Sequence, residues 1–474
     1  MNSKPPIDPT QLWEIHGKYY DLDPFLNKHP GGRRFLEHSR GLDCTALFES
    51  IHIHDKIPKA SLRKFYVADK VDYAPEFDWD ADGFYMTVKS RVREFLSEEA
   101  KRQGLSGRSL RRAHHGTRGF VFRLAMLWVL WAAVSVGAVA YGQWSCALLW
   151  GPLVFALGGY GHEAMHAGVF ESVRANRWLA WLTLDSNGLS SYVFTATHVP
   201  LHHIYTNVEG LDPDIEVHYP LTRERENQKR HGFHALQQFY SWVVYFFTMP
   251  VLYVVDIVAV LSGVWFGPWG KLQRPYSSEM AVFFLCKVGA VATWYVLPYL
   301  IHPWPTALLL NLAMIGGAGL AVQTTFALSH QNELAMNLDH RHSKHPRDWG
   351  AQQLETTVDF QHGHWLPVTI FGGLGFQIEH HLFPTISYSR LGQIAPIVKR
   401  TCEEFGVPYF YYQTAAEAVV AHYRFLHRMG QPPAQPAIAL RQPKSNAAQA
   451  GPLARARSGA VTRKRVQQSN RFRA

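Results

Sequence analysis

The chain is poor in cysteine and has no apolar start. Its four cysteines, Cys44, Cys146, Cys286 and Cys402, show neither disulfide-type nor metal-type spacing among 474 residues. Residues 1–20, MNSKPPIDPTQLWEIHGKYY, contain no apolar core, so we expect no cleavable signal peptide. These absences argue against a disulfide-stapled scaffold and leave membrane insertion to an internal segment.

Long apolar runs are confined to the middle of the chain. Residues 119–141, 281–301 and 306–328 each reach the roughly 20 apolar residues that cross a hydrocarbon core. Residues 144–161 are fewer and richer in glycine, but only two residues separate them from the first run, so they are predicted to form the return limb of a hairpin. We therefore expect an all-α membrane domain with four transmembrane helices in two hairpins.

The distribution of Lys and Arg predicts the orientation of these hairpins. Residues 101–118, before the first run, are rich in both, whereas the two tight connections, YGQWS and HPWP, contain neither. The positive-inside bias places the N-terminus and both hairpin openings in the cytoplasm. A fifth apolar run, 240–266, contains Pro250 and Asp256. A full crossing there would turn the second hairpin over, so we predict that this run lies in the interface or re-enters.

The C-terminal tail, residues 430–474, lacks acidic residues. It has nine Lys and Arg and too few aromatic and branched apolar residues to form a core, which predicts disorder. Attraction to anionic lipid is the plainer interpretation of this charge, and we expect no nucleic-acid partner.

Two histidines near the N-terminus have the form of a haem site. His29 begins an HPGG turn, whose glycines allow close approach of a flat ligand, and His52 follows 23 positions later. A lone loop histidine is usually just solvated, but imidazoles from two separated turns suit axial ligation of a haem iron. Two protein ligands leave no open iron position, so such a domain would carry single electrons.

Further histidines lie in boxes at the edges of the apolar runs. The predicted ligands are His162 and His166 in GHEAMHAG, His198, His202 and His203 in THVPLHHIYTN, His330, and Gln377, His380 and His381 in FQIEHH. Each i, i+4 pair is expected to share one helical face. The loop DHRHSKH, residues 339–345, is instead interpreted as solvated surface.

Eight imidazoles and one amide would satisfy two metal ions with about four ligands each. All of them can lie on the cytoplasmic face if the chain crosses the membrane four times. Imidazole suits iron, copper, zinc and nickel, so ligand type does not name the metal. A fused domain that supplies single electrons favours two irons that activate oxygen over redox-inert zinc.

These patterns resemble two known families. HPGG at 29–32 with GLDCTALFESIH at 41–52 resembles cytochrome b5. The boxes HxxxH, HxxxHH and QxxHH behind that domain resemble the front-end fatty acyl desaturases, over most of residues 10–425. Glu163 stands where that family commonly has Asp, and we expect its carboxylate to orient a ligating imidazole.

The resemblance implies a multidomain protein with a cytoplasmic His-rich cap. The expected parts are a small α+β cytochrome b5-like haem domain at 8–75, a linker and amphipathic approach at 76–118, a membrane desaturase domain at 119–425, and the tail at 430–474. The implied ligands are His29 and His52 for haem b, with His54 a weaker substitute, and the nine box residues for two non-haem irons.

The implied reaction is the O2-dependent insertion of a double bond between existing unsaturation and the carboxyl end of a polyunsaturated fatty acyl chain. The chain would be carried by coenzyme A or phospholipid. Electrons would come from NADH through cytochrome b5 reductase, and the implied location is a lipid bilayer, the endoplasmic reticulum, with both termini cytoplasmic. Aromatic residues within 178–194 are expected to line an acyl tunnel or to face lipid.

Several alternatives stay open. The same site could serve a sphingoid-base desaturase or a lipid hydroxylase, and the product distinguishes them. A membrane-anchored haem electron carrier would hold haem but no iron in the boxes. A transporter fits poorly, because the four predicted spans contain no histidine at mid-depth. Spacing in sequence does not give the depth of a tunnel, so it does not predict which carbon is desaturated. The sequence does not predict the oligomeric state either.

Overall fold

The computed structural model describes residues 8–432, except 215–217, 265–271, 336–346 and 364. Two of the predictions lie outside the described residues. They are the disorder of the tail at residues 433–474 and the solvated histidine-rich loop at 339–345.

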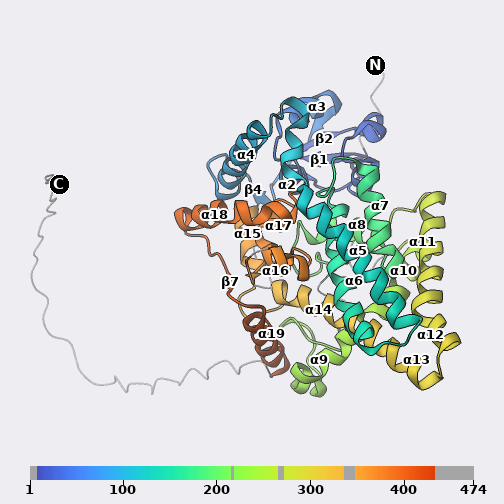
Figure 1. The fold of residues 1–474 in the computed structure, drawn as a ribbon. Helices are drawn as coiled ribbons and strands as arrows, with labels where there is room; N and C mark the ends of the chain where they lie inside the picture. Colours follow the sequence, from blue (N-terminus) through green and yellow to red (C-terminus); the bar gives the residue numbers. More distant parts are fainter. Residues whose placement is uncertain (1–7, 215–217, 265–271, 336–346, 364, 433–474) are drawn as a thin grey trace, which may run out of the picture. The chain divides into compact units, whose positions relative to one another are not determined.

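The N-terminal domain is a small α+β unit, drawn in blue in Figure 1. Its antiparallel sheet has the order β1 (Trp13–Ile15), β2 (Lys18–Tyr20) and β3 (Tyr66–Asp69). Helices α1 (Arg33–His38), α2 (Thr45–Ile51) and α3 (Lys56–Leu62) lie between β2 and β3 in sequence. The domain has an apolar core of its own, formed by Trp13, Ile15, Tyr20, Leu22, Leu26, Cys44 and Phe48.

Residues 76–118, predicted as a linker and amphipathic approach, contain a long helix and a short strand. Helix α4 (Phe84–Arg102) packs against α18 (Tyr388–Phe405), and β4 (Phe77–Asp78) pairs in parallel with β5 (Arg347–Asp348). The buried apolar positions of α4 recur every four residues, at Phe84, Val88, Val92, Leu96 and Ala100. This spacing forms one apolar helical face, which explains why α4 is packed along its length.

Three helical stretches among the described residues are long and apolar enough to cross a membrane. They are α5 (Arg118–Val139), Ser277–Ile301, which contains α11 (Ser277–Ala290) and α12 (Leu297–Ile301), and Trp304–His330, which contains α13 (Trp304–Asn311) and α14 (Gly317–His330). Gly232–Phe246 and Thr248–Ser262, which include α9 (Gln237–Phe246) and α10 (Thr248–Ser262), add a fourth if the two count as one span, although they are bent by 63°. The predicted return limb is the 22-residue helix α6 (Trp144–Met165), which is not among these candidates.

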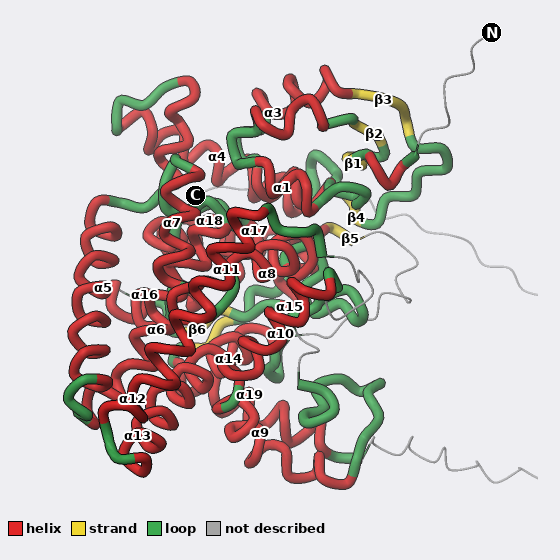
Figure 2. The backbone as a smooth tube through the Cα atoms, turned by 90° about the vertical axis from the view of Figure 1, so that its right-hand side faces the viewer, coloured by secondary structure: helices red, strands yellow, loops and turns green. Residues whose placement is uncertain are grey.

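Helix α6 is largely buried and packs against α5, α14 and α7 (Val173–Thr183) (Figure 2). Glycines permit two close backbone approaches. A Cβ at Gly151 would lie 2.4 Å from the backbone nitrogen of Ala318 in α14, and one at Gly159 would lie 2.3 Å from Cα of Gly372. Any larger residue would separate these backbones, so the glycines fix how α6 sits in the domain.

A buried ion pair joins α10 to α11. Nζ of Lys287 lies 2.7 Å from Oδ2 of Asp256, and both residues are about 5 % exposed or less. Lys287 also lies over the ring of Tyr253, 4.7 Å from its centroid. Because Lys287 belongs to a candidate span, this pair places Asp256 of the bent segment beside that span.

The remaining elements surround the histidine boxes. They are α8 (Ser191–Thr197), α15 (Trp349–Thr356), β6 (Asp359–Phe360), α16 (Trp365–Ile370), α17 (Gln377–Leu382), β7 (Tyr411–Tyr412) and α19 (Ala415–Gly430). The described part of the chain from α4 onward is therefore mostly helical, as predicted.

Candidate haem and metal sites

His29 and His52 face each other across a gap in the N-terminal domain. His29 follows a short 3-10 helix, His52 directly follows α2, and their ring centroids are 6.3 Å apart. Two imidazole nitrogens that each lie about 2 Å from one metal ion place their ring centroids about 6 Å apart. The separation therefore fits two axial ligands of one iron.

Backbone carbonyls orient both rings. Nδ1 of His29 lies 2.9 Å from the carbonyl oxygen of Gly32, and Nδ1 of His52 lies 2.9 Å from that of Phe48. When Nδ1 donates to a carbonyl, the lone pair is on Nε2, which is then the metal-binding nitrogen. Burial lowers the pKa of both imidazoles, to about 3 for His52, which favours the neutral form that binds metal.

The alternative ligand His54 lies elsewhere. Its ring stacks on His114 with 4.9 Å between centroids, and its Nε2 is buried without a hydrogen-bond partner. The fold thus pairs His52, and not His54, with His29.

Local geometry explains the two glycines of HPGG. A Cβ at Gly31 would lie 2.9 Å from Cε1 of His29, and Gly32 has φ of +98°.

The nine predicted box residues come together in two groups, and all are buried. The first group is His162, His166, His198, His203 and His380, and the second is His202, His330 and His381. Within each group, one ligand nitrogen from each ring lies within 4.8 Å of the others. Gln377 joins the second group, with Nε2 3.2 Å from Nε2 of His330 and 3.3 Å from Nε2 of His381.

The predicted pair His198 and His202 lies on one face, with stacked rings and 4.7 Å between their centroids, but the turn between them is not α-helical. The chain forms a π-helical turn at His198–His202, in which the N–H of His203 bonds to the carbonyl of His198. Pro200 has no N–H to donate, which favours this wider turn. His198 consequently joins His203 in the first group, whereas His202 lies with the second.

Several buried polar atoms of both groups have no hydrogen-bond partner among the described residues. Both ring nitrogens of His380, Nε2 of His166, Nε2 of His202 and Oε1 of Gln377 have no hydrogen bond. Nε2 of His162 instead lies 2.9 Å from Nε2 of His198. An unpartnered buried polar group costs roughly 2–7 kcal/mol, and a bound cation would satisfy several of these groups together. The residues therefore fit two metal ions.

Side chains that were not predicted from the sequence orient three of the imidazoles through hydrogen bonds at Nδ1. Nδ1 of His198 lies 2.6 Å from Oδ2 of Asp214, and Nδ1 of His202 lies 2.9 Å from Oδ1 of Asp212. Nδ1 of His381 is within 3.1 Å of Oε1 of Gln353. The available signal was GLDPD at 210–214, an acidic pair soon after the second box. Such partners fix the ring orientation and make the other nitrogen a better ligand.

Glu163 does not have the predicted role. Its Oε2 accepts the backbone N–H of Tyr388 at 3.1 Å, and no hydrogen bond to an imidazole is found among the described residues. Tyr388 provides the contact to the ligand instead, because its hydroxyl lies 3.3 Å from Nδ1 of His162. Glu163 therefore ties α6 to the start of α18.

A third cluster supports α17 from its N-terminal end. Oδ1 of Asp359 accepts the N–H of Ile378 at 2.7 Å, and the hydroxyl of Tyr409 lies 2.7 Å from Asp359 and 2.9 Å from Glu379. Both carboxylates are fully buried. These contacts hold the helix that carries Gln377, His380 and His381.

A cavity of about 100 Å³ lies beside the end of α6, between the HPGG turn and helices α7, α8 and α11. Five residues of the predicted tunnel segment line it, namely Ala180, Trp181, Asp185, Ser191 and Tyr192. Trp178 of the same segment is 60 % exposed. The segment therefore has one part that faces a cavity and another part that faces outward.

Comparison with known proteins identifies two families in this chain. Residues 137–413 match the fatty acid desaturase family, and residues 7–71 match the cytochrome b5-like heme/steroid binding domain.

Named relatives match along most of the chain. It is 30 % identical over 440 residues to an acyl-lipid (8-3)-desaturase of Physcomitrium patens, with 89 % of each chain covered. It is 30 % identical over 447 residues to a chloroplastic acyl-lipid (7-3)-desaturase of Chlamydomonas reinhardtii, covering 89 % of this chain and 81 % of that one. Delta(5) fatty acid desaturase A of Dictyostelium discoideum is 27 % identical over 447 residues, covering 88 % and 90 %. The resemblance predicted from the motifs is thus confirmed, and the chain belongs to the fatty acid desaturase family, with a cytochrome b5-like domain at its N-terminus.

Proposed function

We propose that this protein is a front-end acyl-lipid desaturase, which places a double bond between existing unsaturation and the carboxyl end of a polyunsaturated acyl chain. The observation that carries the proposal is the convergence of eight imidazoles and Gln377 into two buried groups, in which several polar atoms have no hydrogen-bond partner. The relatives named as acyl-lipid (8-3)- and (7-3)-desaturases support both the reaction and an acyl group esterified to membrane lipid rather than to coenzyme A.

Two non-haem irons in these groups would activate O2 and remove one hydrogen from each of two adjacent methylenes, while two electrons and two protons complete its reduction to two waters. His162, His166, His198, His203 and His380 hold one ion, and His202, His330, His381 and Gln377 hold the other. Rotating the side-chain amide of Gln377 by half a turn exchanges its oxygen and nitrogen. Oε1 would then point toward the rings of His330 and His381.

The N-terminal domain supplies the electrons in this proposal. His29 and His52 would hold haem b between them, and a haem with two protein ligands would supply electrons one at a time. The haem is in turn reduced by NADH through cytochrome b5 reductase. This need for single electrons supports iron over zinc in the box groups.

The arrangement in the membrane is part of the same proposal. The chain crosses four times, through α5, α6, α11 with α12, and α13 with α14, and both termini are cytoplasmic in the endoplasmic reticulum. The bent pair of α9 and α10 re-enters or lies in the interface, which its 63° bend supports. With this topology the box residues lie on the cytoplasmic side, where the haem domain and its reductase meet them.

The test is expression of the chain in yeast fed a panel of polyunsaturated fatty acids, with products identified by gas chromatography and mass spectrometry. We expect a new double bond toward the carboxyl end. It should be absent in His380→Ala/His381→Ala and retained in His427→Ala, an exposed histidine outside the groups.

Separating lipid classes soon after feeding tests the carrier, because the new product should appear in phospholipid before it appears in the coenzyme A pool. A hydroxylated product, or no product from haem-loaded protein in membranes that contain the reductase, would contradict the proposal.

A further inference from the structure

The haem-ligand helix α2 is docked into the core of the desaturase domain. Ala46, Leu47 and Ile53 belong to the same apolar cluster as Phe383 and Ile386, and not to the core of their own domain. The carboxylate of Glu49 forms a buried ion pair with Lys89 of α4. His52 is thereby held beside residues 383–388, the segment that follows α17.

One end of this segment is hydrogen-bonded to the residue before the haem ligand. Thr385 Oγ1 donates to the carbonyl oxygen of Ile51 at 3.3 Å, and Ile51 is covalently joined to His52. A second contact reaches the same segment, because the carbonyl of His114 accepts the N–H of Ser387 at 2.8 Å. The ring of His114 stacks on His54, two residues beyond His52.

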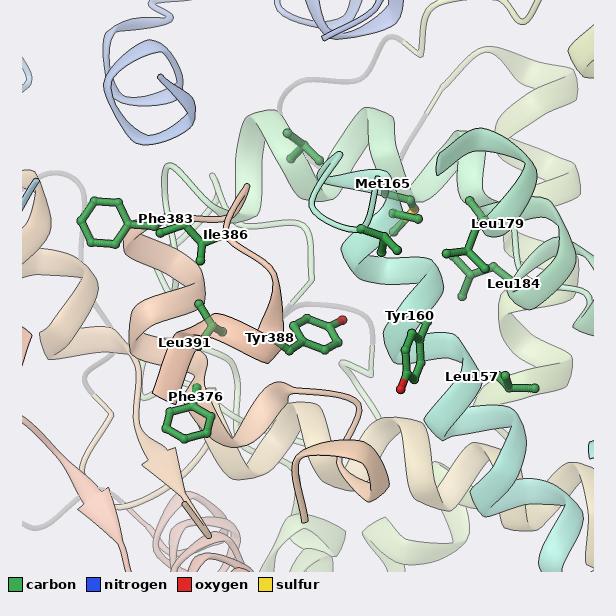
Figure 3. Close-up of a cluster of buried hydrophobic side chains, with 14 of the residues drawn as sticks. Leu157, Tyr160, Met165, Leu179, Leu184, Phe376, Phe383, Ile386, Tyr388 and Leu391 are labelled. Atoms are coloured by element: carbon green, nitrogen blue, oxygen red, sulfur yellow. The ribbon is translucent and has the colours of Figure 1, made fainter. Parts of the chain in front are cut away.

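The other end of the segment reaches a ligand of the first metal group. Figure 3 shows the side chain of Tyr388, the first residue of α18, extending toward α6. Its hydroxyl lies 3.3 Å from Nδ1 of His162 and also donates to the carbonyl of Gly159.

Tyr388 has little freedom to move. It is 3 % exposed, and a Cβ at Gly373, where φ is +85°, would lie 2.2 Å from its ring. The glycine is therefore required for the ring to occupy this position.

We propose that the segment 383–388 is the electron path from the haem to the iron group, with Thr385 and Tyr388 as its positioning residues. This inference rests on the proposed function. One electron leaves the ferrous haem through His52, which becomes the ligand of a ferric haem, and reaches a ferric ion at His162, which becomes ferrous. No bond is made or broken, and two such transfers supply one turnover. Electron tunnelling decays more slowly along covalent and hydrogen bonds than across a van der Waals gap, so the route through Thr385 and Tyr388 is favoured.

The experiment follows haem oxidation by stopped-flow absorbance in purified protein loaded with haem and iron. All metal centres are first reduced chemically without oxygen, and the protein is then mixed with oxygen and the acyl substrate identified in yeast. The first double bond needs no electron from the haem, whereas the haem is oxidised when it reduces the iron group again. Direct oxidation of the haem by oxygen is measured in His380→Ala/His381→Ala and subtracted.

Thr385→Val is expected to slow haem oxidation several-fold, with an unchanged yield of product in the first turnover and an unchanged haem potential. Tyr388→Phe also removes a contact to His162, so it should slow haem oxidation by a larger factor than it lowers the first-turnover product. Thr385→Ser should restore the rate. Thr183→Val and Tyr245→Phe, which each remove a buried hydroxyl outside the segment, should match the wild type.

Haem oxidation at the wild-type rate in both Thr385→Val and Tyr388→Phe would overturn the path. So would slowing that is accompanied by an equal loss of product in the first turnover, because that pattern is a structural effect on the iron group. Failure of the proposed function looks different, since the wild type itself would then form no double bond.

Discussion

The haem site and the iron groups are both built from histidines, but they are supported in different ways. The two haem-site imidazoles come from positions 29 and 52, and their Nδ1 atoms meet the backbone carbonyls of Gly32 and Phe48. The iron groups collect residues from 162 to 381, and side chains such as Asp212, Asp214 and Gln353 stand behind the rings. Side-chain substitution can therefore weaken the iron groups at a distance, whereas the haem site depends on its ligands and on the local backbone.

The largest expected effect separates the two sites. His52→Ala should abolish haem binding and turnover with the reductase, while the iron content stays at the wild-type level, because the box residues are untouched. His54→Ala is the matched control and should retain the haem absorbance spectrum. Metal analysis and absorbance of the purified proteins measure both results, and haem retained in His52→Ala would contradict the ligand assignment.

Removing the carboxylates that contact Nδ1 of His198 and His202 should give the next largest effect. Asp214→Asn and Asp212→Asn are each expected to lower iron affinity or activity by about 10–100-fold, as loss of such a partner does in other metal sites. The haem spectrum should not change. Asp69→Asn, an exposed carboxylate of the haem domain, serves as the control. Equal iron content and activity in all three variants would show that the carboxylates do not tune the groups.

A smaller effect is expected at the contact between the two domains. Removing one partner of a buried ion pair typically costs about 3–5 kcal/mol. Lys89→Met should cost less, because Glu49 keeps His16 at 2.9 Å and Lys59 at 3.3 Å. Thermal unfolding followed by haem absorbance measures the loss, with the exposed Lys18→Met expected within about 0.5 kcal/mol of the wild type. An equal change in both variants would mean that the pair does not hold the haem domain.

The smallest expected effect is that of mild acid on the contribution of Glu49 to stability, which should not change. Burial alone would raise the pKa of Glu49. The hydrogen bond from His16 and the ammonium of Lys89 outweigh burial and hold this pKa below its usual value. A carboxylate with a lowered pKa stabilises the fold above its unfolded value, about 4.3, and this stability is lost as the pH falls through the folded value. Lowering the pH from 7 to 5 should therefore remove none of the contribution of Glu49. The difference in melting temperature between Glu49→Gln and the wild type should be the same at both pH values.

The haem site was accessible from sequence because its determinants are local. HPGG places His29 in a glycine-rich turn, and His52 follows 23 residues later, at the end of the short helix α2. The box histidines were equally visible, and the structure brings all nine predicted ligands together.

The division of these ligands between two groups was not predictable from spacing. It depends on the π-helical turn at Pro200 and on the packing of α6, α14 and α17, which joins residues up to about 220 positions apart. Asp212, Asp214 and Tyr388 were missed for the same reason, since their partners are chosen by three-dimensional packing.

The pair of Lys287 and Asp256 has a consequence for biogenesis. A lysine at the centre of a hydrophobic segment opposes insertion by about 2.5–3.5 kcal/mol on translocon-based scales. Lys287 is the eleventh residue of the stretch Ser277–Ile301, whereas its carboxylate partner is made earlier, on α10. We expect the nascent chain to hold α10 at the translocon until α11 emerges, so that the two segments leave for the lipid together as a neutralised pair.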